Sequence, residues 1–283
     1  MHIRYRRAVS YFVHVLSMIF VCVSDDLPTL DRQLCYFLEL CWQEGESKAT
    51  VADAICGIQH SLNVRRCFPG AWRLFGSWTR AEIPFRAAPL PLFGCFGLSG
   101  ALISLNELGA ATLVCCGFNC ILRTGELLSM CRNHIQWAAD GRSGVIVLPW
   151  TKSGQRAGCT ESVAFSDPVV CNLLLAACRV VGSHDPIFQG SGTRFRGLFD
   201  AALRLCGLQG LDFRPYSLRR GGATNDYMEH LSVANTQIRG RWQSLRACRI
   251  YITEGQEAIS RQAVNQGAMD NCRHFAEFLR RFL

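Results

Sequence analysis

The sequence predicts a mainly α-helical protein with one small β-sheet, arranged as two domains. From Pro28 onward, apolar residues recur at helical spacing through the N-terminal part of the chain. A group of prolines, Pro84, Pro89 and Pro91, then interrupts any helix. Further on, the β-branched run G-V-I-V-L-P-W at 144–150 changes the pattern to that of a strand. At 283 residues the chain is long enough for two modest domains, each with its own core.

Residues 1–25 are predicted to be an N-terminal extension. They begin with three arginines and continue through a largely apolar run at 8–23, which has the outline of a secretory signal. The run is shorter than the roughly 20 apolar residues that span a bilayer, and no small-x-small cleavage site ends it convincingly. We therefore expect a helix or an added N-terminal segment and no membrane partner; a secretory signal or membrane anchor is the alternative.

Residues 26–92 are predicted to form a small all-helical domain. Thr29 can cap a first helix, Gly45 can end it, and a second helix begins near Thr50. A third helix carries several aromatic side chains, and the linker to the next domain is expected at 83–95. Arginines accumulate toward the end of this domain, as a solvated face or as a surface that follows DNA phosphates: Arg65, Arg66, Arg73, Arg80 and Arg86.

Residues 93–283 are predicted to form a larger, mainly helical domain. Helices are expected at 100–116 and 123–130, then a hairpin or small sheet from 144–150 and 161–165, with Lys152 near its turn. Further helices are expected at 168–181, 193–206, 217–230, 232–240 and 246–262. The terminal segment 273–283 carries an apolar stripe, which we expect to pack on its own domain or, alternatively, to dock on a neighbouring subunit.

The composition is compatible with an acidic partner but does not identify one. The net charge of +8 and the pI near 8.8 suit a polyanion. The 16 cysteines are scattered, and no C-x-x-C pair recurs at zinc-ligand spacing. We therefore interpret them, including the cluster Cys115, Cys116 and Cys120, as small buried apolar residues in a reducing compartment, and we expect no metal.

The strongest chemical signal is a basic segment in the last part of the chain. It reads R-P-Y-S-L-R-R-G-G-A-T at 214–224 and G-R-W-Q-S-L-R-A-C-R-I-Y-I at 240–252. Upstream stand L-R-T-G-E-L-L at 122–128 and T-K-S-G at 151–154. These motifs, in the order R, K, (Y)xxR, W, Y, resemble the active site of the tyrosine recombinase (phage integrase) family. The resemblance covers the chain from about Pro28 and is most specific between 100 and 260.

The resemblance implies an N-terminal helical (SAM-like) core-binding domain and a catalytic domain that close around duplex DNA. Tyr251 would be the nucleophile, forming a 3′-phosphotyrosyl link without cofactor or metal because the bond energy is kept. Charge on the transition state would be spread over preorganised donors: Arg123, Arg219, Lys152, Trp242 and Tyr216. Glu126 lies three residues after the first arginine and could orient it. Expected DNA contacts are Arg65, Arg66, Arg73, Arg80, Arg220 and Arg241.

Tyr216 departs from the commonest pattern of the family, because it takes the place of a histidine. A phenol with a pKa near 10 is a poor general base at neutral pH, although it can still donate a hydrogen bond to a phosphoryl oxygen. Two alternatives therefore stay open, namely a descendant that binds DNA without cleaving it and a DNA-relaxing enzyme of the type IB topoisomerase class. The expected partners are double-stranded DNA and a homotetramer on it, in the nucleus or wherever the target DNA is.

Overall fold

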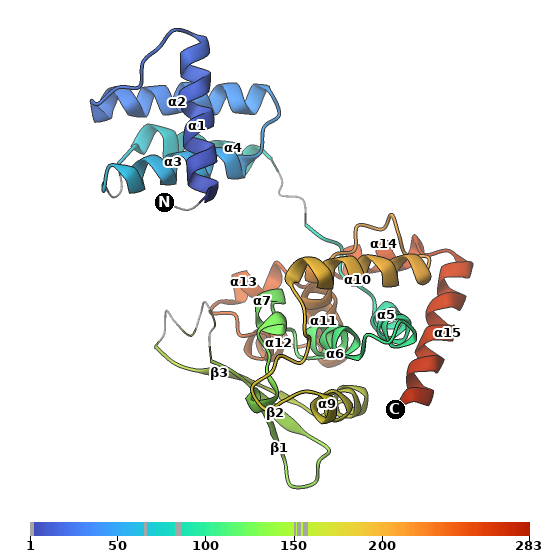
Figure 1. Cartoon of the computed structure of the whole chain (residues 1–283). Coiled ribbons are helices and arrows are strands. Elements are labelled where there is room, and N and C mark those ends of the chain that lie inside the picture. The colour runs from blue at the N-terminus through green and yellow to red at the C-terminus, as the bar shows by residue number, and fades with distance from the viewer. Residues whose placement is uncertain (1–2, 65–66, 83–85, 150, 152–153, 155–157) are drawn as a thin grey trace. The chain divides into compact units, whose positions relative to one another are not determined.

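The computed structural model describes residues 3–64, 67–82, 86–149, 151, 154 and 158–283. In this part of the chain, helices predominate and three strands form one antiparallel sheet (Figure 1). The chain divides into two compact units, Met1–Arg86 and Ala87–Leu283, called here the N-terminal and C-terminal units. The predicted fold class, mainly α with a small β-sheet, is confirmed.

The N-terminal unit is a helical bundle with its own core. Its helices are α1 (Ile3–Met18), α2 (Leu27–Gln43), α3 (Lys48–Ser61) and α4 (Pro69–Ala81). Helix α2 begins one turn earlier than predicted, because the Asp26 carboxylate, and not Thr29, caps it by accepting the Thr29 N–H at 2.9 Å. The Asp31 carboxylate accepts the N–H groups of Gly70 and Ala71, both at 2.9 Å, which fixes the start of α4 on α2.

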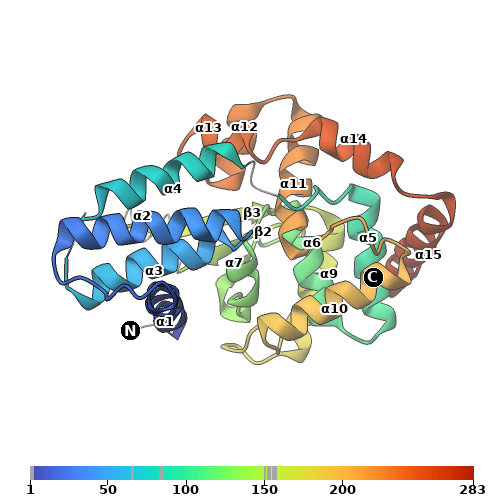
Figure 2. The same ribbon diagram turned by 90° about the horizontal axis from the view of Figure 1, so that it is seen from above.

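Helix α1 belongs to this bundle, in contrast to the predicted extension at 1–25. Its Phe12 and Leu16 side chains are buried, and the Phe12 ring packs edge-on against Phe37 with centroids 5.3 Å apart. In Figures 1 and 2, α1 crosses α2 and α3. The run that resembled a signal is thus one apolar face of an amphipathic helix, and its opposite face is exposed at Val13 and Met18. Within the described residues, no helix is both long enough and apolar enough to cross a membrane.

The boundary between the units falls after Arg86, six residues before the predicted one at 92/93. The cause is the segment that follows Arg86. The Leu90 side chain is fully buried in the core of the C-terminal unit, and its N–H donates to the Ser217 carbonyl at 3.2 Å. These contacts attach residues 87–92 to the C-terminal unit, so the part of the predicted linker just after Arg86 belongs to that unit.

The C-terminal unit surrounds two buried helices, α5 (Leu92–Ser104) and α6 (Leu108–Asn119). Its other helices pack around this pair (Figures 1 and 2). They are α7 (Thr124–Leu128), the short 3-10 helix η1 (Arg132–His134), α9 (Pro168–Val180), α10 (Gly192–Leu205), α11 (Pro215–His230), α12 (Val233–Gly240), α13 (Leu245–Arg249), α14 (Glu254–Gln262) and α15 (Gln266–Phe282).

The helix predicted at 100–116 is in fact the end of α5 and most of α6. Between them Asn106 adopts a left-handed conformation (φ 62°), and the Glu107 N–H closes the turn on the Leu102 carbonyl at 2.9 Å. Both helices are buried almost all round, so apolar residues continue through the break and periodicity alone could not locate it.

The sheet has the order β1–β2–β3 and is antiparallel throughout. Strands β2 (Gly144–Leu148) and β3 (Glu161–Phe165) form the predicted hairpin, and β1 (Ile135–Trp137) adds a strand that was not predicted. Ile146 pairs with Ile135 on one side and with Val163 on the other, and it is fully buried. Lys152 belongs to the β2–β3 connection and lies outside the described residues.

The cysteines of the predicted cluster are buried, as interpreted from the sequence. Cys115, Cys116 and Cys120 are inaccessible to solvent, and burial raises the pKa of Cys116 and brings that of Cys120 to about 12. Cys22 and Cys159 are exposed. In the described part of the chain, no group of three or more His, Cys, Asp or Glu side chains is placed to hold a metal ion.

Helix α15 packs along α5 of its own unit at very close range (Figures 1 and 2). A Cβ atom at Gly100 would overlap the Phe275 carbonyl. We therefore expect Gly100→Ala to destabilise the protein by about 1–3 kcal/mol or more, measured by urea unfolding, because the two backbones must move apart. Gly197→Ala on α10 is the control: its Cβ meets no neighbour, so it should be neutral or stabilise by up to about 1 kcal/mol. Equal effects of the two substitutions would contradict this role of Gly100.

Candidate active site

Arg219 lies at the centre of the motif residues, fully inside the C-terminal unit. Its side chain is 1% exposed. One terminal nitrogen donates to the Ile121 carbonyl and the other to the Gly240 carbonyl at 2.7 Å. The Trp242 ring covers the guanidinium, with 4.6 Å between the guanidinium carbon and the ring centroid. The chain therefore holds this arginine in one orientation before any ligand is present.

The G-G pair after the arginines explains how α11 reaches this depth. A Cβ atom at Gly221 would overlap the Leu90 carbonyl, and one at Gly222 would overlap the Phe118 carbonyl. With hydrogen in place of Cβ, α11 packs directly on the backbone of α6 and of the segment before α5. This close approach places Arg219 beneath the ends of the neighbouring helices.

Tyr251 lies in a break between α13 and α14, where one helix over 246–262 was predicted. The Thr224 hydroxyl on α11 accepts the Thr253 N–H at 3.2 Å and lies 3.1 Å from the Tyr251 carbonyl oxygen. By taking up backbone groups that a continuous helix would use, it ends the helix next to Tyr251. The break lets the tyrosine ring turn toward Arg219, whose guanidinium carbon is 5.4 Å from the ring centroid.

The phenol of Tyr251 is surrounded by the other motif residues. The Tyr216 hydroxyl donates a hydrogen bond to the Tyr251 hydroxyl at 2.5 Å. The Trp242 ring packs against the Tyr251 ring with centroids 4.6 Å apart. Residues 35 positions apart are thus in direct contact, and the structure brings together Tyr216, Arg219, Trp242 and Tyr251 as the motif spacing predicted.

The pKa values of the two tyrosines move in opposite directions. Burial alone would raise the pKa of Tyr251, but the hydrogen bond from Tyr216 and the positive charge of Arg219 outweigh it, so the pKa is lowered. Burial and the same hydrogen bond raise the pKa of Tyr216 to about 12. Arg219 is itself affected: burial, followed by the charges of Arg123 and Arg241, lowers its pKa to about 10, so it stays a cation at neutral pH.

Glu126 joins two further arginines to this group. Arg123 is the N-cap of α7, and the Glu126 carboxylate accepts both its backbone N–H at 2.8 Å and its guanidinium at 2.6 Å. The same carboxylate accepts a hydrogen bond from Arg241 at 2.5 Å. Glu161 on β3 lies 3.5 Å from Arg241. The predicted orienting role of Glu126 thus rests on a capping box, and not on a shared helix face, because α7 starts only after Arg123.

Among the described residues, the buried donors of the site without a hydrogen-bond acceptor include Arg219 Nε and Trp242 Nε1. A buried donor without an acceptor costs roughly 1–3 kcal/mol. An anion that entered beside Tyr251 could accept from them and remove this cost.

The residues predicted to contact DNA are placed in three different ways. Arg73 and Arg80 are exposed, seven residues apart along α4. Arg65 and Arg66, like Lys152, lie outside the described residues. Arg220 and Arg241 are buried instead: Arg220 is 2% exposed and bonds to Gln256 at 3.1 Å, and the side chain of Arg241 is 7% exposed and bonds to Glu126. Acidic or amide partners from distant elements draw both guanidiniums inward.

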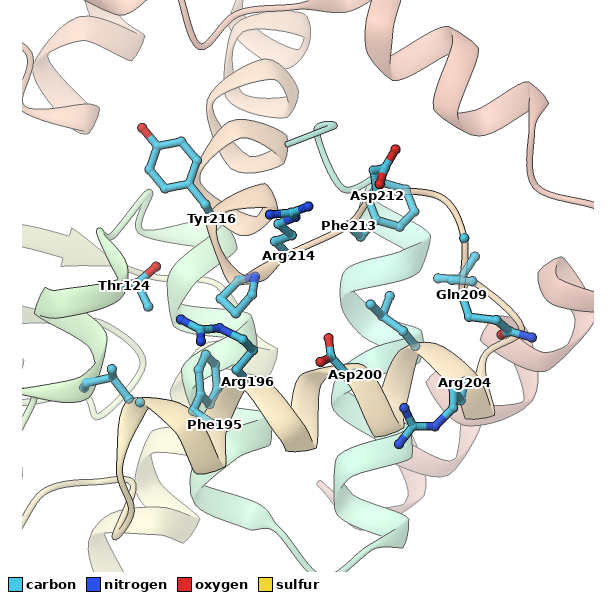
Figure 3. Close-up of a pocket in the computed structure, with 16 residues that line it drawn as sticks. Thr124, Phe195, Arg196, Asp200, Arg204, Gln209, Asp212, Phe213, Arg214 and Tyr216 are labelled. Carbon is cyan, nitrogen blue, oxygen red and sulfur yellow. The ribbon is translucent and has the colours of Figure 1, made fainter. Parts of the chain in front are cut away.

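Sequence reasoning missed a cavity of about 840 Å³ beside Tyr216, lined mainly by α10 and by the segment leading into α11. Figure 3 shows Arg196 and Asp200 on the side of α10 toward Arg214 and Tyr216, and Arg204, which also lines the cavity, farther along the helix. The three arginines are exposed, and they outnumber the acids of the lining, Asp200 and Asp212. The eight-residue spacing of the α10 arginines on one helix face is the signal that could have revealed it.

Comparison with known proteins gives a result for structure and none for sequence. No protein-family model matches the chain, and no curated protein matches it. A XerH site-specific recombinase bound to palindromic difH substrate, in a post-cleavage complex, has 13% identity and a TM-score of 0.61, covering 92% of this chain and 78% of its own. A lambda integrase dimer bound to a COC′ core site has 13% identity and a TM-score of 0.56, covering 88% and 77%.

A second XerH structure, a pre-cleavage complex with difH, has 15% identity and a TM-score of 0.55, covering 91% of this chain and 76% of its own. The matches extend over nearly the whole chain, and all three structures are site-specific recombinases or integrases. Identities this low are informative about architecture only. The architecture predicted from the motifs is confirmed, and the chain has the fold of the tyrosine recombinases.

Proposed function

We propose that this chain is a site-specific DNA recombinase or integrase that cleaves and rejoins DNA through a 3′-phosphotyrosyl intermediate at Tyr251. One observation carries the proposal: in a recombinase fold, Tyr216, Arg219 and Trp242 converge on the phenol of Tyr251. A phenol surrounded by donors and a buried cation is suited to attack on a phosphodiester. A structural tyrosine would need none of these groups.

In the proposed reaction the Tyr251 oxygen attacks phosphorus and the bond from phosphorus to the 5′ oxygen breaks. Negative charge grows on the two non-bridging oxygens. Arg219 Nε and Trp242 Nε1 are proposed to donate hydrogen bonds to these oxygens, because neither has an acceptor among the described residues. Arg123, which is about one-third exposed, extends the positive charge toward solvent. Lys152 is proposed to protonate the departing 5′ oxygen. Rejoining reverses these steps, so no ATP is consumed.

DNA is proposed to pass over the arginine-lined cavity and over the exposed arginines of α4. The double substitution Arg196→Ala/Arg204→Ala should weaken DNA binding and reduce the slope of log K against log salt by about two, because two arginines no longer neutralise a phosphate each. Binding is measured by fluorescence anisotropy at several salt concentrations. Arg273→Ala is the control, because that exposed arginine pairs with Asp270 on α15. An unchanged slope in the double variant would exclude the cavity from the DNA path.

The direct test is covalent trapping. The protein is mixed with nicked duplexes taken from the DNA that flanks its own gene and is then run under denaturing conditions beside Tyr251→Phe. We expect a shifted band for the wild type and none for the variant. Tyr11→Phe is the matched control, because Tyr11 lies in the N-terminal unit and the adduct should persist. Binding without a band on any duplex would instead favour the alternative of a DNA-binding descendant.

Recombination exchanges strands between two sites, so we propose that a homotetramer on DNA is the active form. It would act wherever the target DNA is, in the nucleus or another reducing compartment, and on behalf of a mobile element. A type IB topoisomerase would act as a monomer without site preference. Relaxation of an arbitrary supercoiled plasmid by the wild type, with no preference for its flanking DNA, would favour that second alternative.

A further inference from the structure

We infer that Tyr216 activates the nucleophile: it donates its hydrogen bond to the Tyr251 oxygen in the resting enzyme and passes it to a phosphoryl oxygen as Tyr251 attacks. The inference rests on the proposed function and deepens it, because it gives the residue at the histidine position a different task from that of a base. The observation that carries it is the hydroxyl-to-hydroxyl distance of 2.5 Å between Tyr216 and Tyr251. This distance lies at the short end of the range for O–H···O bonds, so the two hydroxyls are in direct hydrogen-bond contact.

The backbone fixes the donor in place. Tyr216 is the second residue of α11, directly after Pro215, whose ring presets the first helical position. The Arg214 N–H donates to the Ser217 hydroxyl at 3.0 Å, which closes the start of the helix. The side chain is 41% exposed, on the rim of the arginine-lined cavity (Figure 3). Tyr216 therefore touches both the nucleophile and the space where a DNA strand is proposed to lie.

The surrounding charges favour loss of the proton from Tyr251 over loss of the proton from Tyr216. The titratable and charged groups near the pair are Arg219 and Arg220 on α11, Cys248 on α13, and Arg123, Glu126 and Arg241 beyond Arg219. Arg219 lies under the Tyr251 ring, so the negative charge of a phenolate is best placed on Tyr251. Tyr216, whose pKa is raised, keeps its proton and remains the donor.

The step balances without a further reactant. Tyr251 loses its proton to solvent, and Tyr216 stabilises the phenolate that remains. When the Tyr251 oxygen bonds to phosphorus and the bond to the 5′ oxygen breaks, the negative charge moves from the phenolate to the non-bridging oxygens. The departing 5′ oxygen takes up one proton, so the number of protons is conserved. The former phenolate is then an ester oxygen and a poor acceptor, so the Tyr216 hydroxyl turns to the phosphoryl group.

The first test needs no DNA. Protein labelled with ¹³C at the tyrosine ζ carbon is titrated by NMR, and Tyr251 is assigned with Tyr251→Phe. Tyr216→Phe keeps the ring but removes the donor, so the pKa of Tyr251 should rise; Tyr227→Phe, a tyrosine farther along α11, should leave it unchanged. An unchanged Tyr251 pKa in Tyr216→Phe would overturn the inference, whatever the protein does with DNA.

The second test follows the pH dependence of adduct formation. Because the phenolate attacks, the rate of adduct formation should rise with pH and reach a plateau above the pKa of Tyr251. In Tyr216→Phe this plateau should move to higher pH, and the rate at neutral pH should fall by about 10²-fold, as for the loss of one preorganised donor. Tyr216→His restores a donor and should recover most of the rate. A Tyr216→Phe profile that coincides with the wild type would overturn the inference, whereas a wild type without adduct would count against the proposed function and leave the NMR titration to decide.

Discussion

Arg219→Met is expected to abolish the phosphotyrosyl adduct and to lower the free energy of unfolding by about 2–6 kcal/mol, because two buried carbonyls lose their donor. The reason is that Arg219 has two tasks. It lies beneath Tyr251, and it also satisfies the carbonyls of Ile121 and Gly240, which become buried acceptors without donors in the variant. Each such orphaned group costs about 1–3 kcal/mol. Urea unfolding gives the stability change, and covalent trapping gives the adduct.

Two further variants separate these tasks. Arg219→Lys keeps the charge but cannot reach both carbonyls with one planar fork, so it should still form a folded protein with weaker adduct formation, by about 10²–10³-fold. Arg204→Met removes an exposed arginine of the cavity and should leave stability within about 0.5 kcal/mol of the wild type. If Arg219→Met has the same urea midpoint of unfolding as the wild type, then Arg219 does not hold the segments that contain Ile121 and Gly240 together.

Glu126→Ala should produce the second large effect, a destabilisation of about 3–5 kcal/mol, because it removes one partner from a buried ion network. The carboxylate is 5% exposed and neutralises both Arg123 and Arg241. Without it, these cations lie near Arg219 with less compensation, and the N-terminal cap of α7 is lost as well. Adduct formation should also fall, because Arg123 loses the group that orients it.

Glu107→Ala is the matched control for this prediction. It breaks a pair of similar length with Arg194, at 2.6 Å, but the arginine is 49% exposed, so the loss should stay below about 1 kcal/mol. Thermal unfolding of the two variants side by side measures the difference. Equal losses would indicate that burial adds nothing to the Glu126 pairs.

The sequence was most informative where chemistry depends on spacing along one segment. The motifs at 214–224 and 240–252, through their resemblance to a known active site, predicted four residues that the fold brings together: Tyr216, Arg219, Trp242 and Tyr251. Apolar residues at helical spacing also predict a helix that is buried on one face. The predicted ranges of α9 and α10 agree with the structure to within one residue.

The features that the sequence did not predict depend on partners far along the chain. The break at Tyr251 is made by Thr224 on α11, and nothing between 246 and 262 indicates it. Arg220 and Arg241 stand in a basic segment that is typical of a DNA-binding surface, yet Gln256 and Glu126 draw them inside. The N-terminal residues could be assigned to the bundle only once Phe12 was found against Phe37.

Two exposed cysteines make it possible to attach spectroscopic probes to the natural sequence. Cys22 and Cys159 are the exposed cysteines, one in each unit, while most of the others are buried and have raised pKa values that suppress the thiolate. A short reaction with a maleimide dye mixture should therefore label these two positions first. Energy transfer between the dyes, recorded as duplex is added, would then follow the movement of one unit relative to the other without a single engineered residue.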